Sequence, residues 1–249
     1  MDVVQRMATL FDISTTPQPP TLHHDDYLCH GRLMVWHGPK VIVATPLLDQ
    51  PLGSYPALDE PAASDILTAA KSAWSQGRGD WARAAMGERI EHMERFLAAM
   101  ARQREAVSQL IMWEIAKSWN DAQKEFDRTV RYIERSIETV KDMDRDASRL
   151  VLEEGYVAQI RRMPLGVGLC MGPYNYPLNE TFATLIPALL MGNAVILKPP
   201  RLGVLLYRPL LEAFVQCFPP GVINTVYGDG PVVASPLMRS GDIDVLAFI

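Results

Sequence analysis

The sequence predicts an α/β fold, and the first observation behind this prediction is the alternation of short apolar runs with helical segments after residue 165. Each apolar run is short enough for a buried strand, whereas the segments between the runs have the length of helices. Repeated strand–helix–strand units imply right-handed crossovers and a parallel sheet. The strands are expected at GVGLCM, AVILK, VINTVY and DVLAF, and the helices at LNETFATLIPALLMG, GVLLYRPLLEAFVQCF and PVVASPLMRS.

The second observation is a long helical region before the sheet, from Ser64 to about Asp144. Ser64 suits a helix start, and few helix breakers follow Gly87. Acidic and basic residues are nearly balanced in this region, which is typical of solvated helix faces. Near its far end, apolar residues recur at the spacing of one helical face, at Phe126, Val130, Ile133, Ile137 and Val140.

The N-terminal region is expected to contain an arm, a few strands and a linker. Residues 1–22 include the proline-rich STTPQPPT and predict a loose arm. Residues 27–45 predict a hairpin or meander with HGPK as its turn, and residues 46–63, with four prolines, predict a linker over the surface. Two more strands are expected within residues 149–163, joined at Glu154-Gly155.

Composition and charge narrow the possible function classes. The chain has 249 residues, 48% of them hydrophobic and 21% charged, which is ordinary for a globular protein. Its formal net charge of -5 argues against a nucleic-acid-binding surface. The cysteines at positions 29, 170 and 217 do not make a disulfide framework and suit a reducing cytoplasm. No apolar stretch is long enough for a signal peptide or a membrane span, so we expect a cytoplasmic protein that binds neither nucleic acid nor membrane.

A stiff turn follows the first predicted strand of the sheet. In GPYNYPLNE, Asn175 lies between two tyrosines, and this triplet lies between two prolines, which exclude a helix interior or a central strand. Ligands of a doubly wound sheet bind at the carboxyl ends of its strands, and a rigid turn there can aim an amide N–H₂ at an oxyanion. The alternative is that Asn175 only caps its own turn. Asn179, just beyond, is the candidate N-cap of the next helix, which Gly192 closes.

Basic residues and glycines follow the next two strands. In ILKPPRLG, Lys198 and Arg201 are suited to bind ribose hydroxyls or a phosphate, although basic loop residues are commonly just solvated. In YGDGP, Gly228 and Gly230 allow a backbone to approach a pyrophosphate, and a tight turn explains them equally well. The three-glycine dinucleotide fingerprint is absent.

The segment HHDDYLCH, residues 23–30, contains six possible metal ligands. Neighbouring residues of an extended chain point to opposite sides, so these side chains do not converge on one ion. The segment also belongs to the expected surface arm. We therefore expect no metal site.

In their order and spacing, these stretches resemble the aldehyde dehydrogenase superfamily over most of residues 64–249. WARAAMGERIEHMERFLAAM is similar to its first long helix, and EIAKSWNDAQKEFDRTV to its E-x-G-K helix. PLGVGLCMGPYNYP, PALLMGNAVILKP and GVINTVYGDG resemble its three nucleotide-domain signatures. Within the superfamily, NYP and KPP look most like the non-phosphorylating, NADP-dependent glyceraldehyde-3-phosphate dehydrogenases.

The resemblance implies an α/β fold in which an N-terminal arm and helices lead into an incomplete, Rossmann-like parallel sheet of the superfamily's cofactor domain. Residues 1–63 would form the arm and β-meander, and 64–148 the helical part of the cofactor-binding domain. Residues 149–163 resemble oligomerisation strands, and 164–249 would be the nucleotide-binding part, truncated before the catalytic domain. A homodimer or homotetramer is therefore expected.

The resemblance also assigns roles to single residues. Asn175 would be catalytic, donating its amide to the thiohemiacetal oxyanion. Arg128 and Tyr176 match contacts to the substrate phosphate, although helical periodicity explains a merely solvated Arg128 equally well. Members that use NAD have a glutamate where this chain has Arg201, so the expected cofactor is NADP, with NAD possible. The cofactor would contact Met171, Gly172, Pro173, Tyr174, Lys198, Pro200, Arg201, Gly228 and Gly230.

The implied reaction is the oxidation of an aldehyde to its acid, for the closest pattern glyceraldehyde 3-phosphate to 3-phosphoglycerate. The superfamily's nucleophilic Cys and its Glu base follow beyond DVLAFI, and none of the three cysteines present has a base placed for thiolate chemistry. The chain alone is therefore expected to be inactive, as the N-terminal part of the enzyme or as a shortened, non-catalytic nucleotide-binding or structural relative. A semialdehyde dehydrogenase is a further alternative.

Overall fold

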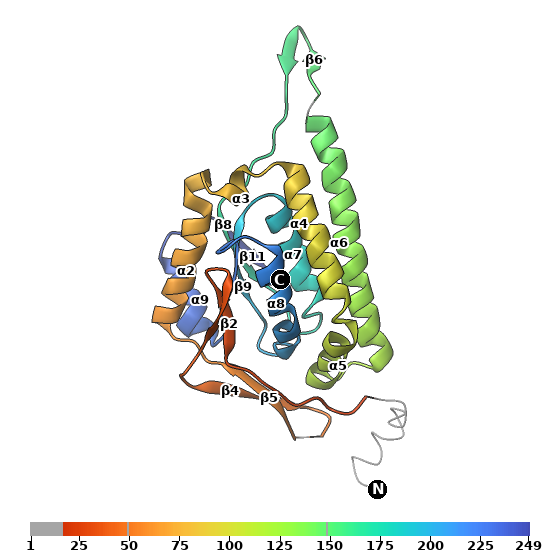
Figure 1. The fold of residues 1–249 in the computed structure, drawn as a ribbon, viewed down its shortest axis with the longest axis vertical. Coiled ribbons are helices and arrows are strands. Elements are labelled where there is room, and N and C mark those ends of the chain that lie inside the picture. Colours follow the sequence, from red (N-terminus) through yellow and green to blue (C-terminus); the bar gives the residue numbers. More distant parts are fainter. Residues whose placement is uncertain (1–16, 49, 148) are drawn as a thin grey trace.

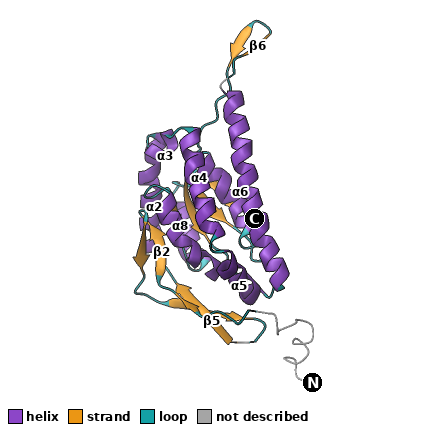
Figure 2. Cartoon of the chain, turned by 45° about the vertical axis from the view of Figure 1, so that its right-hand side comes forward, coloured by secondary structure: helices purple, strands orange, loops and turns teal. Residues whose placement is uncertain are grey.

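Helices cover both faces of a four-stranded parallel sheet in the computed structural model, which describes residues 17–48, 50–147 and 149–249 (Figures 1 and 2). The spatial order of the strands is β10-β9-β8-β11, and every pairing in this sheet is parallel. The predicted α/β fold is therefore confirmed. The strands are β8 (Val167–Met171), β9 (Ala194–Lys198), β10 (Ile223–Thr225) and β11 (Val245–Phe248).

The strand order divides the helices between the two faces. The chain runs outward from β8 to β10 and then returns to the other side of β8, so right-handed crossovers put the last helix opposite the first two. Accordingly α7 (Asn179–Leu190) packs with α4 (Met86–Ala101) and α6 (Trp119–Ala147), whereas α9 (Gly230–Arg239) packs with α2 (Glu60–Trp74) (Figure 1). The long α6 buries Phe126, Ile133, Ile137 and Val140, as its periodicity predicts.

Three predicted boundaries in the helical regions are wrong. Helix α2 begins at Glu60 rather than Ser64, because the Asp59 carboxylate accepts the Ala62 N–H at 2.9 Å. Asn179 is the first residue of α7, not its cap, and its N–H donates to the Glu125 carboxylate at 3.2 Å. The helix expected after residue 203 divides at Pro209, which has no N–H to donate, into the 3₁₀ helix η2 (Leu205–Leu210) and α8 (Leu211–Cys217).

The N-terminal strands differ from the predicted meander and linker. The hairpin of β2 (Asp26–Cys29) and β3 (Arg32–Val35) turns at His30-Gly31, where both residues have positive φ. The HGPK segment instead leads to a separate sheet, in which β4 (Lys40–Thr45) pairs with β5 (Gln50–Pro56) and β5 with β1 (Leu22–His23). The predicted surface linker at 46–63 thus contains the strand β5, most of which is buried, and the first turn of α2. Pro51 and Pro56 are tolerated because they lie near the ends of the strand. Residues 1–16 of the predicted arm lie outside the described residues.

The predicted strands at 149–163 form a hairpin, β6 (Val151–Glu153) and β7 (Tyr156–Ala158), that stands away from the body beyond the end of α6 (Figure 2). Its turn at Glu154-Gly155 has positive φ at both residues, as the sequence indicates. The hairpin and its flanks carry exposed apolar side chains, namely Leu150, Val151, Leu152, Tyr156, Val157 and Ile160.

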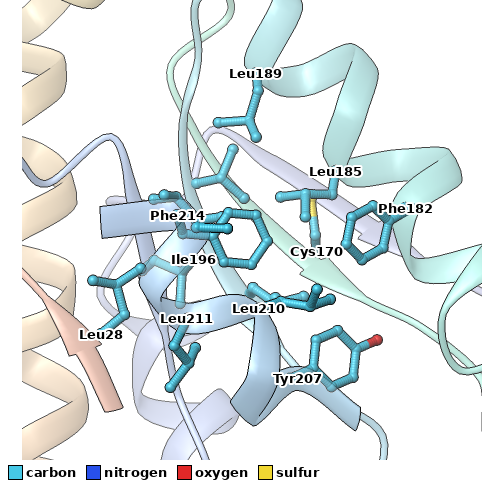
Figure 3. Packing of buried hydrophobic residues seen from close by; sticks show 14 of the residues in the cluster. Leu28, Cys170, Phe182, Leu185, Leu189, Ile196, Tyr207, Leu210, Leu211 and Phe214 are labelled. Atoms are coloured by element: carbon cyan, nitrogen blue, oxygen red, sulfur yellow. The ribbon is translucent and has the colours of Figure 1, made fainter. Parts of the chain in front are cut away.

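The core on one side of the sheet is centred on aromatic rings from α4, α7 and α8. The centroid of the Phe96 ring lies 4.6 Å from that of Phe214 and 6.2 Å from that of Phe182. Leu28 of β2 and Ile196 of β9 lie in the same cluster (Figure 3). Because stacked rings have preferred geometries as well as buried area, this cluster fixes the helices that follow β8 and β9.

His24 is a buried histidine between the N-terminal strands and the sheet. Its ring meets the Tyr227 ring edge-on at 5.5 Å, and its Nδ1 lies 3.2 Å from the carbonyl oxygen of Asp26. Burial lowers the pKa of His24 from 6.5 to about 4, and the nearby Arg208 guanidinium acts in the same direction. The folded protein therefore keeps this ring neutral at pH values at which the unfolded chain protonates it.

We expect His24 to make the protein less stable in mild acid. The pKa of His24 is lower in the folded protein than in the unfolded chain, so the unfolded chain takes up a proton first as the pH falls. The neutral ring therefore contributes its full share of the unfolding free energy above about pH 6.5, and this share is lost as the pH falls towards 4. Between about pH 7.5 and 5 the loss is about 2 kcal/mol of unfolding free energy. Urea denaturation should show this loss in the wild type and in the control His37→Gln, but not in His24→Gln. An equal loss in His24→Gln would contradict the assignment.

Candidate functional site

The predicted site residues gather at the carboxyl edge of the parallel sheet. Strands β8 and β9 pair in register up to Met171, which lies opposite Lys198. The loops that leave them, residues 172–178 and 199–204, therefore start side by side, and the loop after β10 joins them. This is the edge at which doubly wound sheets bind their ligands.

A pocket of about 340 Å³ at this edge contains four of the predicted cofactor residues. They are Lys198, Arg201, Gly228 and Gly230, which come from two different loops. Its other walls are Asp229 and two residues of the N-terminal sheet, Val41 and Tyr55. Sequence reasoning missed Val41 and Tyr55 because their strands were taken for a meander and a linker. Asp229 lies between the two glycines of YGDGP, and that position is the signal that would have identified it.

The two cations of the pocket differ in their surroundings. Lys198 is 8% exposed, and burial lowers the pKa of its ammonium while the Asp229 carboxylate opposes that shift. Arg201 is exposed, and within the described residues its guanidinium has no hydrogen bond or ion pair. A guanidinium of this kind offers its fork of N–H donors to an incoming anion.

The three glycines near the pocket occupy their positions for different physical reasons. A Cβ at Gly228 would lie 3.1 Å from the Leu58 carbonyl oxygen, and the residue has φ +126°, so the fold itself requires a glycine. A Cβ at Gly172 would lie 1.8 Å from Thr181 Oγ1, which makes this glycine a packing requirement of α7. A Cβ at Gly230 would meet nothing within 4 Å. Gly230 opens α9, where Pro231 has no N–H and the N–H groups of Val232 and Val233 donate to the Asp229 carbonyl oxygen at 3.0 Å. Within the described residues, the Gly230 N–H is therefore the one donor of this first turn that has no backbone acceptor there.

The turn that carries Asn175 is fixed by hydrogen bonds to the Pro177 carbonyl oxygen, whereas the Asn175 side chain is exposed. The Pro177 carbonyl oxygen accepts hydrogen bonds from the Tyr207 hydroxyl and, at 2.6 Å, from Thr181 Oγ1. Asn175 itself is exposed, and its amide makes no hydrogen bond within the described part of the chain. An asparagine that only caps its turn would bond to that turn's backbone, so the arrangement favours an amide that is free to meet a ligand.

Two cations lie near Tyr176, the residue after Asn175. Lys117 Nζ is 3.7 Å from the centroid of the Tyr176 ring, and Arg128 Cζ is 5.8 Å from it. The two residues predicted to bind substrate, Arg128 and Tyr176, therefore lie together. Lys117 was not predicted, although it is the lysine of the quoted EIAKSW segment.

The remaining predicted cofactor residues do not line this pocket. Met171 ends β8, and Gly172, Pro173 and exposed Tyr174 lead from it to Asn175. Pro200 lies between Lys198 and Arg201 in the next loop. These residues therefore lie at or just after the carboxyl ends of β8 and β9.

The three thiols lie in apolar surroundings. Burial raises the pKa of Cys29 and of Cys170 to about 11, and it raises the pKa of Cys217 as well. A thiolate nucleophile needs the opposite shift. None of the three is therefore prepared for attack on a carbonyl carbon.

The side chains of residues 23–30 have partners other than a metal. His23 Nδ1 lies 2.9 Å from Ser54 Oγ, and Asp25 and Asp26 pair with Lys40 and Arg208. Across residues 17–48, 50–147 and 149–249, His, Cys, Asp and Glu side chains form no group of three or more that would hold a metal ion. In the same residues no helix is both long and apolar enough to cross a membrane.

Two larger hollows lie away from the predicted residues. One, of about 570 Å³, is at the amino edge of the sheet between Lys71 and Asp242, which form an ion pair. The other, of about 520 Å³, is mainly apolar and lies beside Cys170 and Pro187. Neither contains any of the predicted residues Lys198, Arg201, Gly228 or Gly230, so the pocket beside Lys198 is the better candidate for a nucleotide.

The chain is similar to known proteins over most of its length. It is 29% identical over 218 residues to an NADP-dependent glyceraldehyde-3-phosphate dehydrogenase of Streptococcus equinus, which covers 84% of this chain and 44% of the relative. It is 32% identical over 180 residues to an N-succinylglutamate 5-semialdehyde dehydrogenase of Chromohalobacter salexigens, covering 72% of this chain and 36% of that relative. The chain thus spans less than half the length of these relatives.

Solved structures of similar proteins have the same fold. The crystal structure of the NADP-dependent glyceraldehyde-3-phosphate dehydrogenase of Bacillus halodurans complexed with NADP superposes with a TM-score of 0.79 and 28% identity, over 90% of this chain and 47% of that one. The family model described as the aldehyde dehydrogenase family matches residues 36–249. Because that match covers most of the sequence, this chain belongs to the aldehyde dehydrogenase family.

Proposed function

We propose that this chain supplies the cofactor site and the oxyanion-stabilising amide of an NADP-dependent aldehyde dehydrogenase that oxidises glyceraldehyde 3-phosphate to 3-phosphoglycerate. The observation that carries the proposal is the pocket that combines Lys198 and Arg201 with Gly230, one strand away from the exposed Asn175 amide. In this proposal the nucleophilic Cys and the Glu base belong to a segment outside the chain. The three buried thiols with raised pKa values support that assignment.

The pocket residues fit the adenosine end of NADP. Arg201 and Lys198 are two donors for a 2′-phosphate, and the free space at Gly230 lets the backbone approach a pyrophosphate, to which the Gly230 N–H can donate. The Asp229 carboxylate limits the net positive charge and is suited to accept a ribose hydroxyl. When bound, NADP would accept a hydride from the substrate carbon.

Asn175 would stabilise the charge that develops on the aldehyde oxygen. When a thiolate attacks the carbonyl carbon, the C=O π electrons move to the oxygen, and an N–H donor aimed at that oxygen lowers the barrier. An exposed amide on a turn fixed through the Pro177 carbonyl is preorganised for this role. Arg128, with no ion pair in the described residues, and Tyr176 would bind the phosphate of the same substrate.

An oligomer in a reducing compartment is part of the proposal. The apolar side chains of the β6–β7 hairpin are exposed and stand clear of the body, which supports contact with a second subunit in a dimer or tetramer. Three free, buried cysteines suit the cytoplasm.

A non-catalytic nucleotide-binding relative is the second candidate, because three thiols with raised pKa values fit a protein without a nucleophile equally well. The intact mass of the natural gene product separates the two candidates. A product about twice this length that contains a further Cys and Glu and forms NADPH from glyceraldehyde 3-phosphate supports the enzyme. A natural product of this length that binds NADP without forming NADPH supports the second candidate.

In the complete enzyme, Asn175→Ala should lower kcat by about 10²- to 10³-fold, the usual cost of one oxyanion donor. The NADP dissociation constant should stay nearly unchanged, because the amide faces the substrate oxygen. Steady-state NADPH formation and calorimetric titration measure the two effects, with the exposed Asn120→Ala as control. A kcat within a few-fold of the wild type would make Asn175 only a turn former.

Replacing Arg201 by glutamate should reverse the charge that favours NADP. A charge-assisted hydrogen bond contributes about 1.5–3 kcal/mol, so the ratio of kcat/KM for NADP to that for NAD should fall by at least about ten-fold. The control is Arg95→Glu, an exposed arginine on α4. If the ratio does not move, selectivity for NADP comes from elsewhere.

Arg128→Ala should raise KM for glyceraldehyde 3-phosphate without raising it for an uncharged aldehyde. Loss of one phosphate-binding guanidinium should cost about ten-fold or more in KM. The control is Arg135→Ala, another exposed arginine on α6. Equal effects on the two aldehydes would remove Arg128 from the substrate site.

A further inference from the structure

Two carboxylates from the helices beside the site are buried, and neither touches the pocket. Glu114 lies in the last turn of the helix α5 (Arg104–Ile115) and is 1% exposed, and Glu125 on α6 is 2% exposed. Each accepts backbone N–H groups from one of the two site loops. We propose that Glu114 and Glu125 are positioning residues that fix the cofactor loop and the Asn175 turn to one corner of the fold, an inference that rests on the function proposed above.

Glu114 holds the end of the cofactor loop. Its Oε1 accepts the Val204 N–H at 2.8 Å, and its Oε2 accepts the Leu205 N–H at 3.0 Å. These N–H groups open η2, immediately after the loop that carries Arg201. Both oxygens are used, so the loop end has a fixed distance from α5.

Glu125 holds the end of the Asn175 turn. Its Oε1 accepts the N–H groups of Leu178 and Asn179 at 3.0 and 3.2 Å, where α7 begins. Its Oε2 pairs with Lys117, whose ammonium also lies over the Tyr176 ring. One ion pair therefore connects α6, the start of α7 and the residue next to Asn175.

The cofactor loop and the Asn175 turn are in contact with each other. Gly203 of the cofactor loop packs so closely on Pro177 of the turn that a Cβ there would lie 2.5 Å from the proline ring, with Ile115 of α5 just behind. The Tyr207 hydroxyl of η2 donates to the Pro177 carbonyl oxygen. The corner between α5 and α6 thus sets the position of each loop and the spacing between them.

Simple helix capping does not explain this choice of residues. Neither η2 nor α7 has a side-chain cap at its own N-cap position. A local Ser or Asn would satisfy the same N–H groups without burying a carboxylate, which is unfavourable unless it is paired and hydrogen-bonded. The carboxylates instead lie 90 and 53 residues before the N–H groups that they bind. A local cap fixes only the end of its own helix, whereas these long-range contacts fix each loop relative to α5 and α6.

Hydrogen exchange at pH 8, above the pKa of about 7 to which burial raises Glu114, tests the positioning directly. Glu114→Gln should speed exchange at Val204 and Leu205, and Glu125→Gln at Leu178 and Asn179, each by about ten-fold, since a charged acceptor binds an N–H about twice as strongly as a neutral one. The controls are the exposed Glu105→Gln on α5 and Glu134→Gln on α6. Unchanged exchange, or a rise that extends equally to strand β9, overturns the proposal.

Kinetics of the complete enzyme separate positioning from general stability. Glu114→Gln should raise KM for NADP about five-fold or more and keep kcat within about two-fold, whereas Glu125→Gln should lower kcat about ten-fold and keep that KM. Loop-specific exchange with both kinetic parameters unchanged overturns the proposal. If the wild type forms no NADPH, the proposed function fails, and the exchange pattern alone decides the anchoring.

The aspartate variants protect the test against misfolding. Glu114→Asp and Glu125→Asp keep the charge but shorten the reach of the carboxylate by one methylene. Should a glutamine variant not fold, the aspartate variant must show the same loop-specific rise in exchange. A folded aspartate variant with wild-type exchange in its loop overturns the proposal.

Discussion

The parallel pairing of β8 with β9 is the constraint on which the site depends. It sets Met171 beside Lys198, so that the chain leaves both strands at one edge and both loops begin at the same height. All residues of β9 are buried, and β8 is buried except at its last residue, so a one-residue slip would move each side chain to the opposite face of the sheet, where the helices are packed against a different side chain. The hydrophobic pattern of two five-residue strands therefore determines where a cation and an amide can meet.

The helices then convert this shared edge into a shaped site. The stacked rings of Phe96, Phe182 and Phe214 fix α7 and α8 against α4. Carboxylates from α5 and α6 reach the starts of α7 and η2. Both site loops are therefore bounded by a buried strand at one end and a held helix at the other, and little of their geometry depends on the loops themselves.

The sequence was informative where physical signals are local. Short apolar runs that alternate with helical segments identified the parallel sheet, the 3.6-residue period identified α6, and the Glu154-Gly155 turn identified the β6–β7 hairpin. The signatures around Asn175, Lys198 and Gly230 identified the edge at which these residues lie. The sequence was not informative where contacts between distant parts of the chain determine the local structure. Prolines suggested a linker where β5 pairs with both β1 and β4, and a serine suggested a helix start that Asp59 provides instead.

The same distinction applies to the candidate site. Lys198, Arg201 and the glycines follow predicted strands and were identified from that position. No short motif could identify the other residues of the site, because their contacts join parts of the chain that are far apart in the sequence. These residues are Tyr55, Lys117 and the two buried carboxylates. Glu114 and Lys117 both belong to the quoted EIAKSW segment, yet only the three-dimensional contacts reveal what each side chain holds.

One wall of the nucleotide pocket has a consequence for how the protein folds. Val41 and Tyr55 come from the N-terminal sheet, and Leu58, which follows its strand β5, donates its N–H to the carbonyl oxygen of Tyr227, just after β10. The neighbouring hairpin strand β2 is attached to β10 through the Leu28 N–H, which donates to Thr225 Oγ1 across 197 residues of chain. Closure entropy delays such long-range contacts relative to local ones. During synthesis the pocket therefore has no complete wall until β10 has emerged. A nucleotide that binds there would fasten the N-terminal sheet to the loops that follow β9 and β10.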